Sequence, residues 1–218
     1  MVKLFLLSIG IACFSSMIYI IPVVIILQYA LFKQCSLGKM FMVFVFAVYL
    51  MAVFSVVGIP TIYEMKVDFT FNLIPLIDIF NSPSAYIRNT ILNIILFMPL
   101  GFLLPVIWKD YRSIKKTVLM GLAISVLIEL LQIFSYRLTD VDDLITNTLG
   151  TFLGYYCGKR FSFELPLKIL RKAENASKKW EPVIILIATF LIAVFFQPLV
   201  SNKIWDIVLS SSLWESLQ

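Results

Sequence analysis

Residues 4–32 read LFLLSIGIACFSSMIYIIPVVIILQYALF, an uninterrupted apolar run without a single charged side chain. As an α-helix, a stretch of this length would span roughly 43 Å, whereas the hydrocarbon core of a bilayer is about 30 Å thick. We therefore expect it to cross a membrane as a tilted helix or as one kinked at Pro22. It is too long for the core of a signal peptide and no small-residue cleavage site follows it, so we expect it to be retained.

The composition of the whole chain also favours a membrane protein. Of its 218 residues, 61% are hydrophobic and 14% are charged, whereas about 25% of a typical soluble domain is charged. A soluble domain of this size could not bury so many apolar side chains, because a small folded body needs polar cover over a large surface. The composition thus excludes a soluble globular enzyme, a disordered chain and a disulfide-rich secreted scaffold.

Further apolar segments follow the first one, and they predict an all-α, polytopic transmembrane helix bundle of about six spans. These segments cover residues 40–59, 91–107, 117–136, 144–157 and 183–200. The segment 144–157 is short and rich in Gly and Thr, so it would cross only when packed among other helices. We expect residues 1–218 to form a single membrane domain, with interfacial helices over residues 161–180 and 203–217.

The distribution of basic residues predicts the orientation of these spans. With six spans, the connections around Lys33, Lys115 and Lys172 share one side and hold most of the 18 lysines and arginines. Lys and Arg collect on the cytoplasmic loops of membrane proteins, so this side should be cytoplasmic and both termini extracytoplasmic. The net charge of +5 then has a topological explanation and requires no nucleic-acid partner.

The residue types that the sequence lacks narrow its chemistry. It contains no histidine, which excludes Ser-His-Asp triads and His-containing metal sites. Its cysteines, Cys13, Cys35 and Cys157, are far apart and form no CxxC pair, so neither a zinc cluster nor a redox pair is expected. No cofactor is expected either, although a divalent cation bridging acidic residues would suit oxygen ligands.

Polar residues inside the expected spans are the functional candidates, because each is costly to bury in hydrocarbon. The predicted topology gathers them in the outer half of the membrane and at the outer turn before residue 144. The candidates on these grounds are Asn93, Glu129, Gln132, Arg137, Asp140, Asp142, Asp143 and Asn147. A purely structural role stays open for them: the amides would tie helices together, and the aspartates would stabilise a helix N-terminus.

Helical spacing groups these residues on two faces. Glu129 and Gln132 share one face of the fourth expected span, because they are three residues apart. Asp143, Gly150 and Gly154 share one face of the fifth, together with Asn147. The two glycines form a GxxxG pair, which lets another helix approach closely. We therefore expect this face to press against the third or the fourth span.

At these positions the sequence resembles the VanZ-like family of bacterial membrane proteins. The resemblance rests on FNLIP at 71–75, NIILFMPLGF at 93–102, ELLQ at 129–132, Arg137 with the three aspartates that follow, and NTLG at 147–150 before Gly154. It covers about residues 67–160 as a family core, with residues 4–32, 40–59 and 183–200 as accessory spans. It implies a bacterial cell membrane location and a link to teicoplanin resistance, and it adds Asn72 to the candidate site residues.

Three functions are compatible with this pattern. The first is binding, in which a polar pocket on the extracytoplasmic side holds a lipid-linked cell-envelope precursor or a lipoglycopeptide, with Arg137 on a phosphate. The second is an enzyme that modifies a lipid-linked envelope substrate, with Glu129 and Asp143 as its acid–base pair. The third is a transporter or flippase, which the lack of polar residues on the inner halves of the spans disfavours. We favour binding, because no nucleophile is evident; the oligomeric state stays open.

Overall fold

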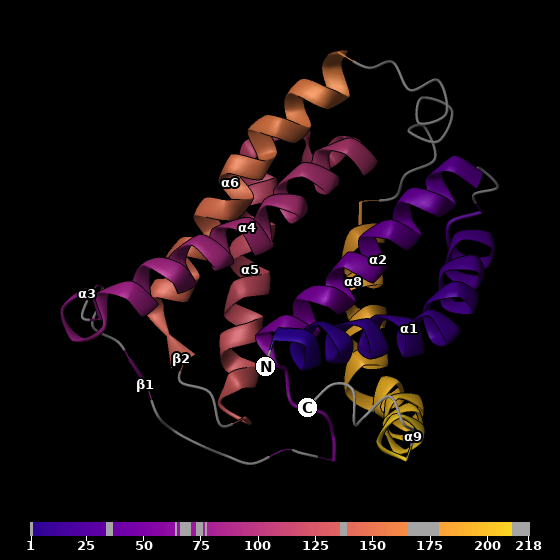
Figure 1. Cartoon of the computed structure of the whole chain (residues 1–218). Helices are drawn as coiled ribbons and strands as arrows, with labels where there is room; N and C mark the ends of the chain where they lie inside the picture. Colours follow the sequence, from indigo (N-terminus) through magenta and orange to yellow (C-terminus); the bar gives the residue numbers. More distant parts are fainter. Residues whose placement is uncertain are drawn as a thin grey trace.

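The computed structural model describes residues 2–33, 37–63, 65, 71–72, 76, 78–135, 139–164 and 179–210, and nearly all of them are helical (Figure 1). The longer helices are α1 (Val2–Ile26), α2 (Leu37–Val57), α4 (Pro83–Ile107), α5 (Ile114–Gln132), α6 (Val141–Glu164), α8 (Glu181–Leu191) and α9 (Gln197–Leu209). The shorter ones are α3 (Asp78–Asn81), the 3-10 helix η2 (Lys109–Arg112), and the π-helical turns η1 (Leu27–Leu31) and η3 (Ile192–Phe196). Two short strands, β1 (Phe71–Asn72) and β2 (Thr139–Asp140), pair in parallel.

Helices long and apolar enough to cross a membrane confirm the class of protein. Judged by length and composition, they are Leu6–Leu31, Leu37–Val57, Pro83–Ile107 and Glu181–Leu209. Helices α5 and α6 form at the two other expected spans. Helix α5 carries Lys115, Lys116 and Glu129 within its 19 residues, and α6 is rich in Gly, Thr and Tyr with charged residues at both ends, so neither is as apolar as the other four. The chain is therefore a helical membrane protein with four clear candidate spans.

Two helices begin earlier than their apolar runs predict. Helix α4 begins at Pro83 rather than at residue 91, because proline suits the first turn of a helix, where its missing N–H would be unpaired anyway. The turns that follow Pro83 are polar, so hydropathy alone does not assign them to a membrane-spanning helix. Helix α6 begins at Val141 rather than at residue 144, with Asp142 and Asp143 in its first turn. Acidic side chains are favourable there, because they face the positive end of the helix dipole.

The helices form two groups that meet at α2 and α4. Helices α4, α5 and α6 pack together on one side, and α1, α2 and α8 pack together on the other (Figure 1). At the junction, the rings of Phe46 and Trp108 meet edge to face with centroids 5.0 Å apart. The hydroxyl of Tyr49 on α2 also donates to the carbonyl oxygen of Leu96 on α4, at 2.7 Å. The apolar core is continuous across both groups.

The two ends of this bundle differ in charge. At one end, which we call the acidic end, α2 and α5 finish and α4 and α6 begin (Figure 1). This end carries Asp140, Asp142 and Asp143. At the other end, the basic end, α4 finishes and α5 and α8 begin. Residues 109–116 lie there and include four lysines and arginines against one aspartate.

The expected interfacial helices fall largely outside the described residues. Of residues 161–180, the structure describes 161–164 as the end of α6 and 179–180 as a turn. Of residues 203–217, it describes the part up to 210, most of which belongs to α9. Helix α9 follows η3 and turns away from the axis of α8 (Figure 1). Its Gln197 side chain lies 3.5 Å from the Ser15 hydroxyl of α1.

An ion pair that hydropathy did not predict joins the helices of the second group. The ammonium of Lys39 on α2 lies 2.7 Å from the carboxylate of Glu181 on α8, and both side chains are at most 1% exposed. The other carboxylate oxygen of Glu181 accepts a hydrogen bond from Gln28, at 2.9 Å. Gln28 lies in the π-helical turn η1, where the wider turn interrupts the regular helix. A buried charge needs such a partner, because desolvation alone is expensive.

Candidate binding site

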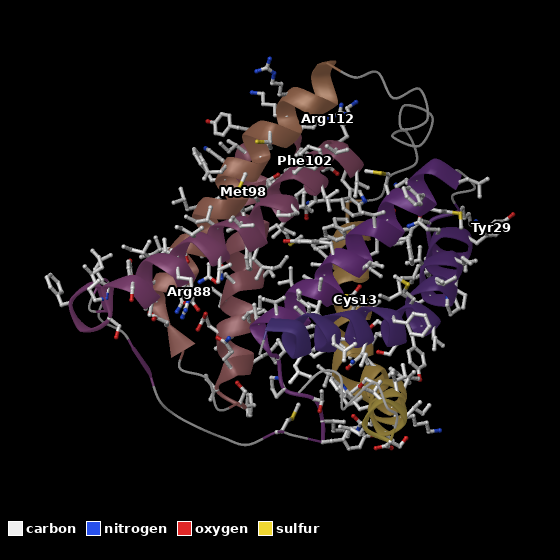
Figure 2. All side chains as sticks on the ribbon, in the orientation of Figure 1. Cys13, Tyr29, Arg88, Met98, Phe102 and Arg112 are labelled. Carbon is white, nitrogen blue, oxygen red and sulfur yellow. The ribbon has the colours of Figure 1, made fainter. Side chains whose placement is uncertain are left out.

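Helices α4 and α6 lie in backbone contact, and glycines make this contact feasible. A methyl group built on Gly150, Gly154 or Gly158 would overlap the α4 backbone at Ile94, Met98 or Phe102, respectively. Figure 2 labels Met98 and Phe102 on the part of α4 beside α6. The expectation that this face of the fifth span presses against another helix is confirmed, and that helix is α4. The contact fixes the position of the acidic end of α6 against the start of α4.

Polar contacts continue the same interface toward the acidic end. The amide of Asn93 on α4 donates to the carboxylate of Asp143 on α6, at 2.7 Å. The same amide nitrogen lies 3.4 Å from the hydroxyl of Thr146, which itself donates to the carbonyl oxygen of Asp142. Asn93 thus ties the two helices together just before they separate around a cavity.

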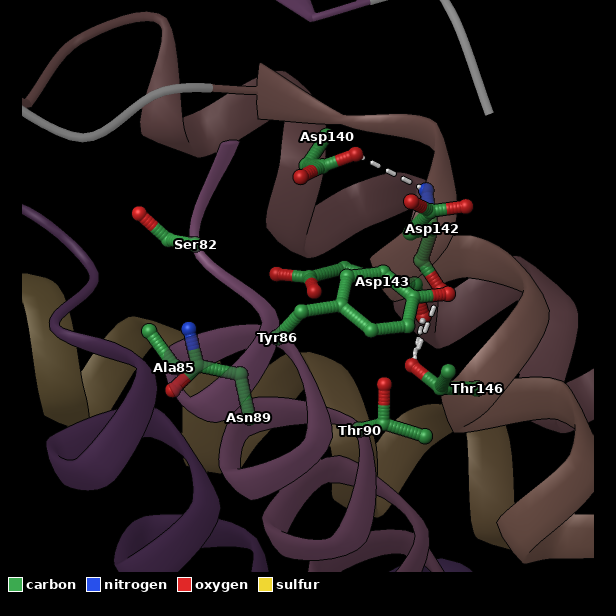
Figure 3. A pocket seen from close by; sticks show the side chains of 9 residues that line it. All are labelled: Ser82, Ala85, Tyr86, Asn89, Thr90, Asp140, Asp142, Asp143 and Thr146. Carbon is green, nitrogen blue, oxygen red and sulfur yellow. Dashed lines mark hydrogen bonds between the residues drawn. The ribbon is translucent and has the colours of Figure 1, made fainter. Parts of the chain in front are cut away.

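This cavity has a volume of about 150 Å³ and lies between the first turns of α4 and α6 (Figure 3). One wall comes from Ser82, Ala85, Tyr86, Asn89 and Thr90, and the other from Asp140, Asp142, Asp143 and Thr146. The first wall supplies hydroxyl and amide groups and the second supplies carboxylates. Such a lining favours a ligand group with several hydrogen-bond donors, such as an amine or a set of sugar hydroxyls.

Backbone hydrogen bonds hold the carboxylates of this cavity in place. The carboxylate of Asp140 accepts the backbone N–H of Asp142, at 2.9 Å (Figure 3). The carboxylate of Asp142 accepts the backbone N–H of Leu76, at 3.0 Å, and this contact holds Leu76 against the first turn of α6. The described residues contain no group of three or more acidic or cysteine side chains placed to share one metal ion.

Glu129 supports the cavity from behind. Its side chain is 4% exposed, and one carboxylate oxygen accepts the backbone N–H of Asp140, at 2.9 Å. Glu129 therefore fixes the strand β2, which carries Asp140 into the cavity wall. This contact joins α5 to the strand that directly precedes α6.

The two remaining amide candidates lie within the bundle rather than in the cavity wall. Gln132 donates to the backbone carbonyl of Val57 at the end of α2, at 3.2 Å. Asn147 donates to the hydroxyl of Ser125 on α5, at 2.9 Å. Both side chains are buried, and their carbonyl oxygens have no hydrogen-bond partner among the described residues. They tie helices together, and each retains one acceptor that a bound water or ligand donor would satisfy.

The structure thus divides the predicted site residues. Asp140, Asp142 and Asp143 line the cavity. Asn93 and Glu129 hydrogen-bond to these lining residues, whereas Gln132 and Asn147 tie helices together within the bundle. The side chains of Asn72 and Arg137 lie outside the described residues. Sequence reasoning missed the whole α4 wall, although Tyr86, Asn89 and Asn93 follow a helical spacing that would have revealed it. Because residues 84–90 are polar, hydropathy did not predict that they form the first turns of this helix.

These features define a helical membrane protein whose acidic cavity opens between two helices in glycine contact. The chain belongs to the VanZ/LLP1 family, whose model matches residues 17–164. It is similar to Protein VanZ of Enterococcus faecium, with 35% identity over 108 residues. This match covers 49% of the present chain and 60% of that relative. No solved structure matches the chain.

Proposed function

We propose that this protein lowers susceptibility to teicoplanin-type lipoglycopeptides by binding a lipid-linked cell-envelope precursor, or the antibiotic itself, in the cavity between α4 and α6. Membership of the VanZ/LLP1 family supports the link to teicoplanin. The observation that carries the binding proposal is the cavity itself, in which Asp140, Asp142 and Asp143 face the hydroxyl-bearing wall of α4. Carboxylates accept hydrogen bonds from amines and sugar hydroxyls, and both groups occur in envelope precursors and glycopeptides.

The charge of the cavity limits the part of a ligand that it takes. Three aspartates close together repel a bare phosphate, so an amine or sugar would enter while any phosphate stays outside. A divalent cation held between one of these aspartates and the phosphate is a second way to bind, because Mg²⁺ and Ca²⁺ prefer oxygen ligands. Ligand binding with and without added Mg²⁺ separates the two modes.

The proposal also needs the cavity to face the cell exterior. We propose six crossings, with α5 and α6 crossing beside α4 and the acidic end extracytoplasmic. The support is that residues 109–116 and Lys179 lie at the opposite end, where cytoplasmic basic residues belong. Cysteines at Ser82 and Ser113, each in a background without native cysteines, test it in intact cells. An impermeant thiol reagent should label the first and not the second; the reverse pattern would invert the map.

A direct binding experiment tests the proposal in the purified protein. Ala85→Phe would fill the cavity from the α4 wall without removing a carboxylate. Ser84→Phe is the matched control, because Ser84 is exposed and does not line the cavity. Teicoplanin, or a lipid-linked peptidoglycan precursor, should raise the melting temperature of wild type and Ser84→Phe but not of Ala85→Phe. An equal rise in all three proteins would exclude this cavity as the site.

A further inference from the structure

A second cavity lies at the basic end, far from the acidic aspartates. Its volume is about 290 Å³, and it is a groove between the first turns of α5 and the start of α8. Leu119, Met120 and Ala123 of α5 form one wall, and Trp180 and Val183 form the other. Leu119 is 64% exposed and Trp180 is 63% exposed. An apolar groove open to this extent must be filled in a membrane by something equally apolar.

Charge and apolar character are ordered along this groove. Lys116 and Lys179 lie at its mouth. Along α5 the apolar residues then follow at three, four and seven positions after Lys116, which places them on one helical face. The wall thus runs about 10 Å from the lysines toward the middle of the bundle, at about 1.5 Å per residue. A cationic mouth followed by an apolar wall matches a lipid with an anionic headgroup and a long acyl chain.

We propose that this groove binds one anionic phospholipid, with its phosphate at Lys116 and Lys179 and one acyl chain along Leu119, Met120 and Ala123. Charge complementarity selects the headgroup, because basic residues near a membrane surface attract anionic lipids. The proposal does not depend on the acidic cavity or on its ligand. It adds a lipid-specific contact at the opposite end of the molecule.

The remaining polar groups of the groove are compatible with a lipid phosphate. Asp110 lies 3.7 Å from Lys116, and both side chains are about half exposed. This pair therefore leaves Lys179 as the stronger anchor. Lys179 lies 5.5 Å from the ring centroid of Trp180, which holds it at the mouth. Burial, and to a lesser extent the charge of Asp110, raises the pKa of Tyr111, so this phenol stays protonated at neutral pH.

Lipid-dependent thermal stability of the delipidated full-length protein in detergent tests the proposal. Phosphatidylglycerol should raise the melting temperature more than phosphatidylcholine with the same acyl chains. Lys179→Gln should raise the half-saturating concentration of phosphatidylglycerol about fivefold, the loss expected for one basic residue at the membrane surface. Lys203→Gln, an exposed substitution on α9, should leave it unchanged.

Two further measurements distinguish a lipid-binding groove from a site that binds any anion. Ala123→Phe would fill the groove and should abolish the preference for phosphatidylglycerol; Leu119→Gln serves the same purpose should the first variant fail to fold, because Leu119 is exposed. Inorganic phosphate at matched concentration should produce no shift. Equal shifts with both lipids, a full shift with phosphate alone, or wild-type lipid response in the groove variants would each overturn the proposal.

Discussion

Asn93 on α4 donates a hydrogen bond to Asp143 on α6, with Nδ2 and Oδ1 2.7 Å apart across 50 positions of sequence. This contact stands where glycine-mediated packing of the two helices ends and the acidic cavity begins. It holds the carboxylate wall of the cavity at a fixed distance from the hydroxyl wall. The geometry of the candidate site therefore depends on a bond between helices as well as on the residues that line it.

Asn93→Leu should destabilise the protein by about 1–3 kcal/mol, because Asp143 loses a donor to its partly buried carboxylate. Asn202→Leu, on the exposed surface of α9, is the control and should change the melting temperature little. The double variant with Asp143→Leu should lose less than the sum of the single variants, since both remove the same bond. Strict additivity would show that the two side chains do not interact.

Gly154→Ala should cost at least about 1–3 kcal/mol of stability, because the added methyl group would overlap the Met98 carbonyl and force α4 and α6 apart. Gly10→Ala is a matched control, because Gly10 also lies in a helix but has open space around it. That change should be neutral or stabilising by up to about 1 kcal/mol. Thermal unfolding in detergent measures both. If the two variants melt alike, the helices are not in close contact.

Breaking the buried pair between Lys39 and Glu181 should be costly. Lys39→Met leaves the Glu181 carboxylate buried without its ammonium partner, and a loss of about 3–5 kcal/mol is expected. Combining it with Glu181→Leu should recover most of this loss, because no uncompensated charge then remains. Chemical unfolding of the three variants provides the measurement. A double variant less stable than Lys39→Met would contradict this explanation.

Comparing Glu129→Gln with Glu129→Leu shows whether the hydrogen-bond acceptor of Glu129 or its negative charge stabilises the protein. Glutamine can still accept the backbone N–H of Asp140, so it should preserve most of the stability. Leucine removes the acceptor and should cost about 1.5–3 kcal/mol, the range for hydrogen bonds to charged groups. Melting temperatures of the two variants test the ranking. Equal losses would mean that the charge of Glu129, rather than its bond to Asp140, is what matters.

The sequence was a good guide to the helices, because apolar runs report directly on the lipid environment. Each of the four candidate spans overlaps a run that hydropathy predicts, and the glycine spacing correctly predicted the close contact of α6 with another helix. The VanZ-like motifs likewise led to the family that the comparison confirms. The count of six crossings stays a prediction, because α5 and α6 are less apolar than the four candidate spans.

Contacts between distant segments account for most of what the sequence did not reveal. Lys39 and Glu181 are 142 residues apart, and the sequence around each residue does not indicate that the two form an ion pair. Tyr86 and Asn89 lie in polar turns of α4 that extend beyond the apolar run, so a search for apolar segments left them out. The cavity needs both walls, and only the packing of α4 against α6 brings them together.

The central claim, that the cavity between α4 and α6 lowers lipoglycopeptide susceptibility, is tested most directly in cells. The measurement is the minimum inhibitory concentration of teicoplanin in a susceptible host expressing wild type, Ala85→Phe or Ser84→Phe at equal membrane levels. The wild type and Ser84→Phe should raise this concentration above that of the empty vector, and Ala85→Phe should not. Full resistance with Ala85→Phe would contradict the claim, because the cavity it fills would then have no part in the function.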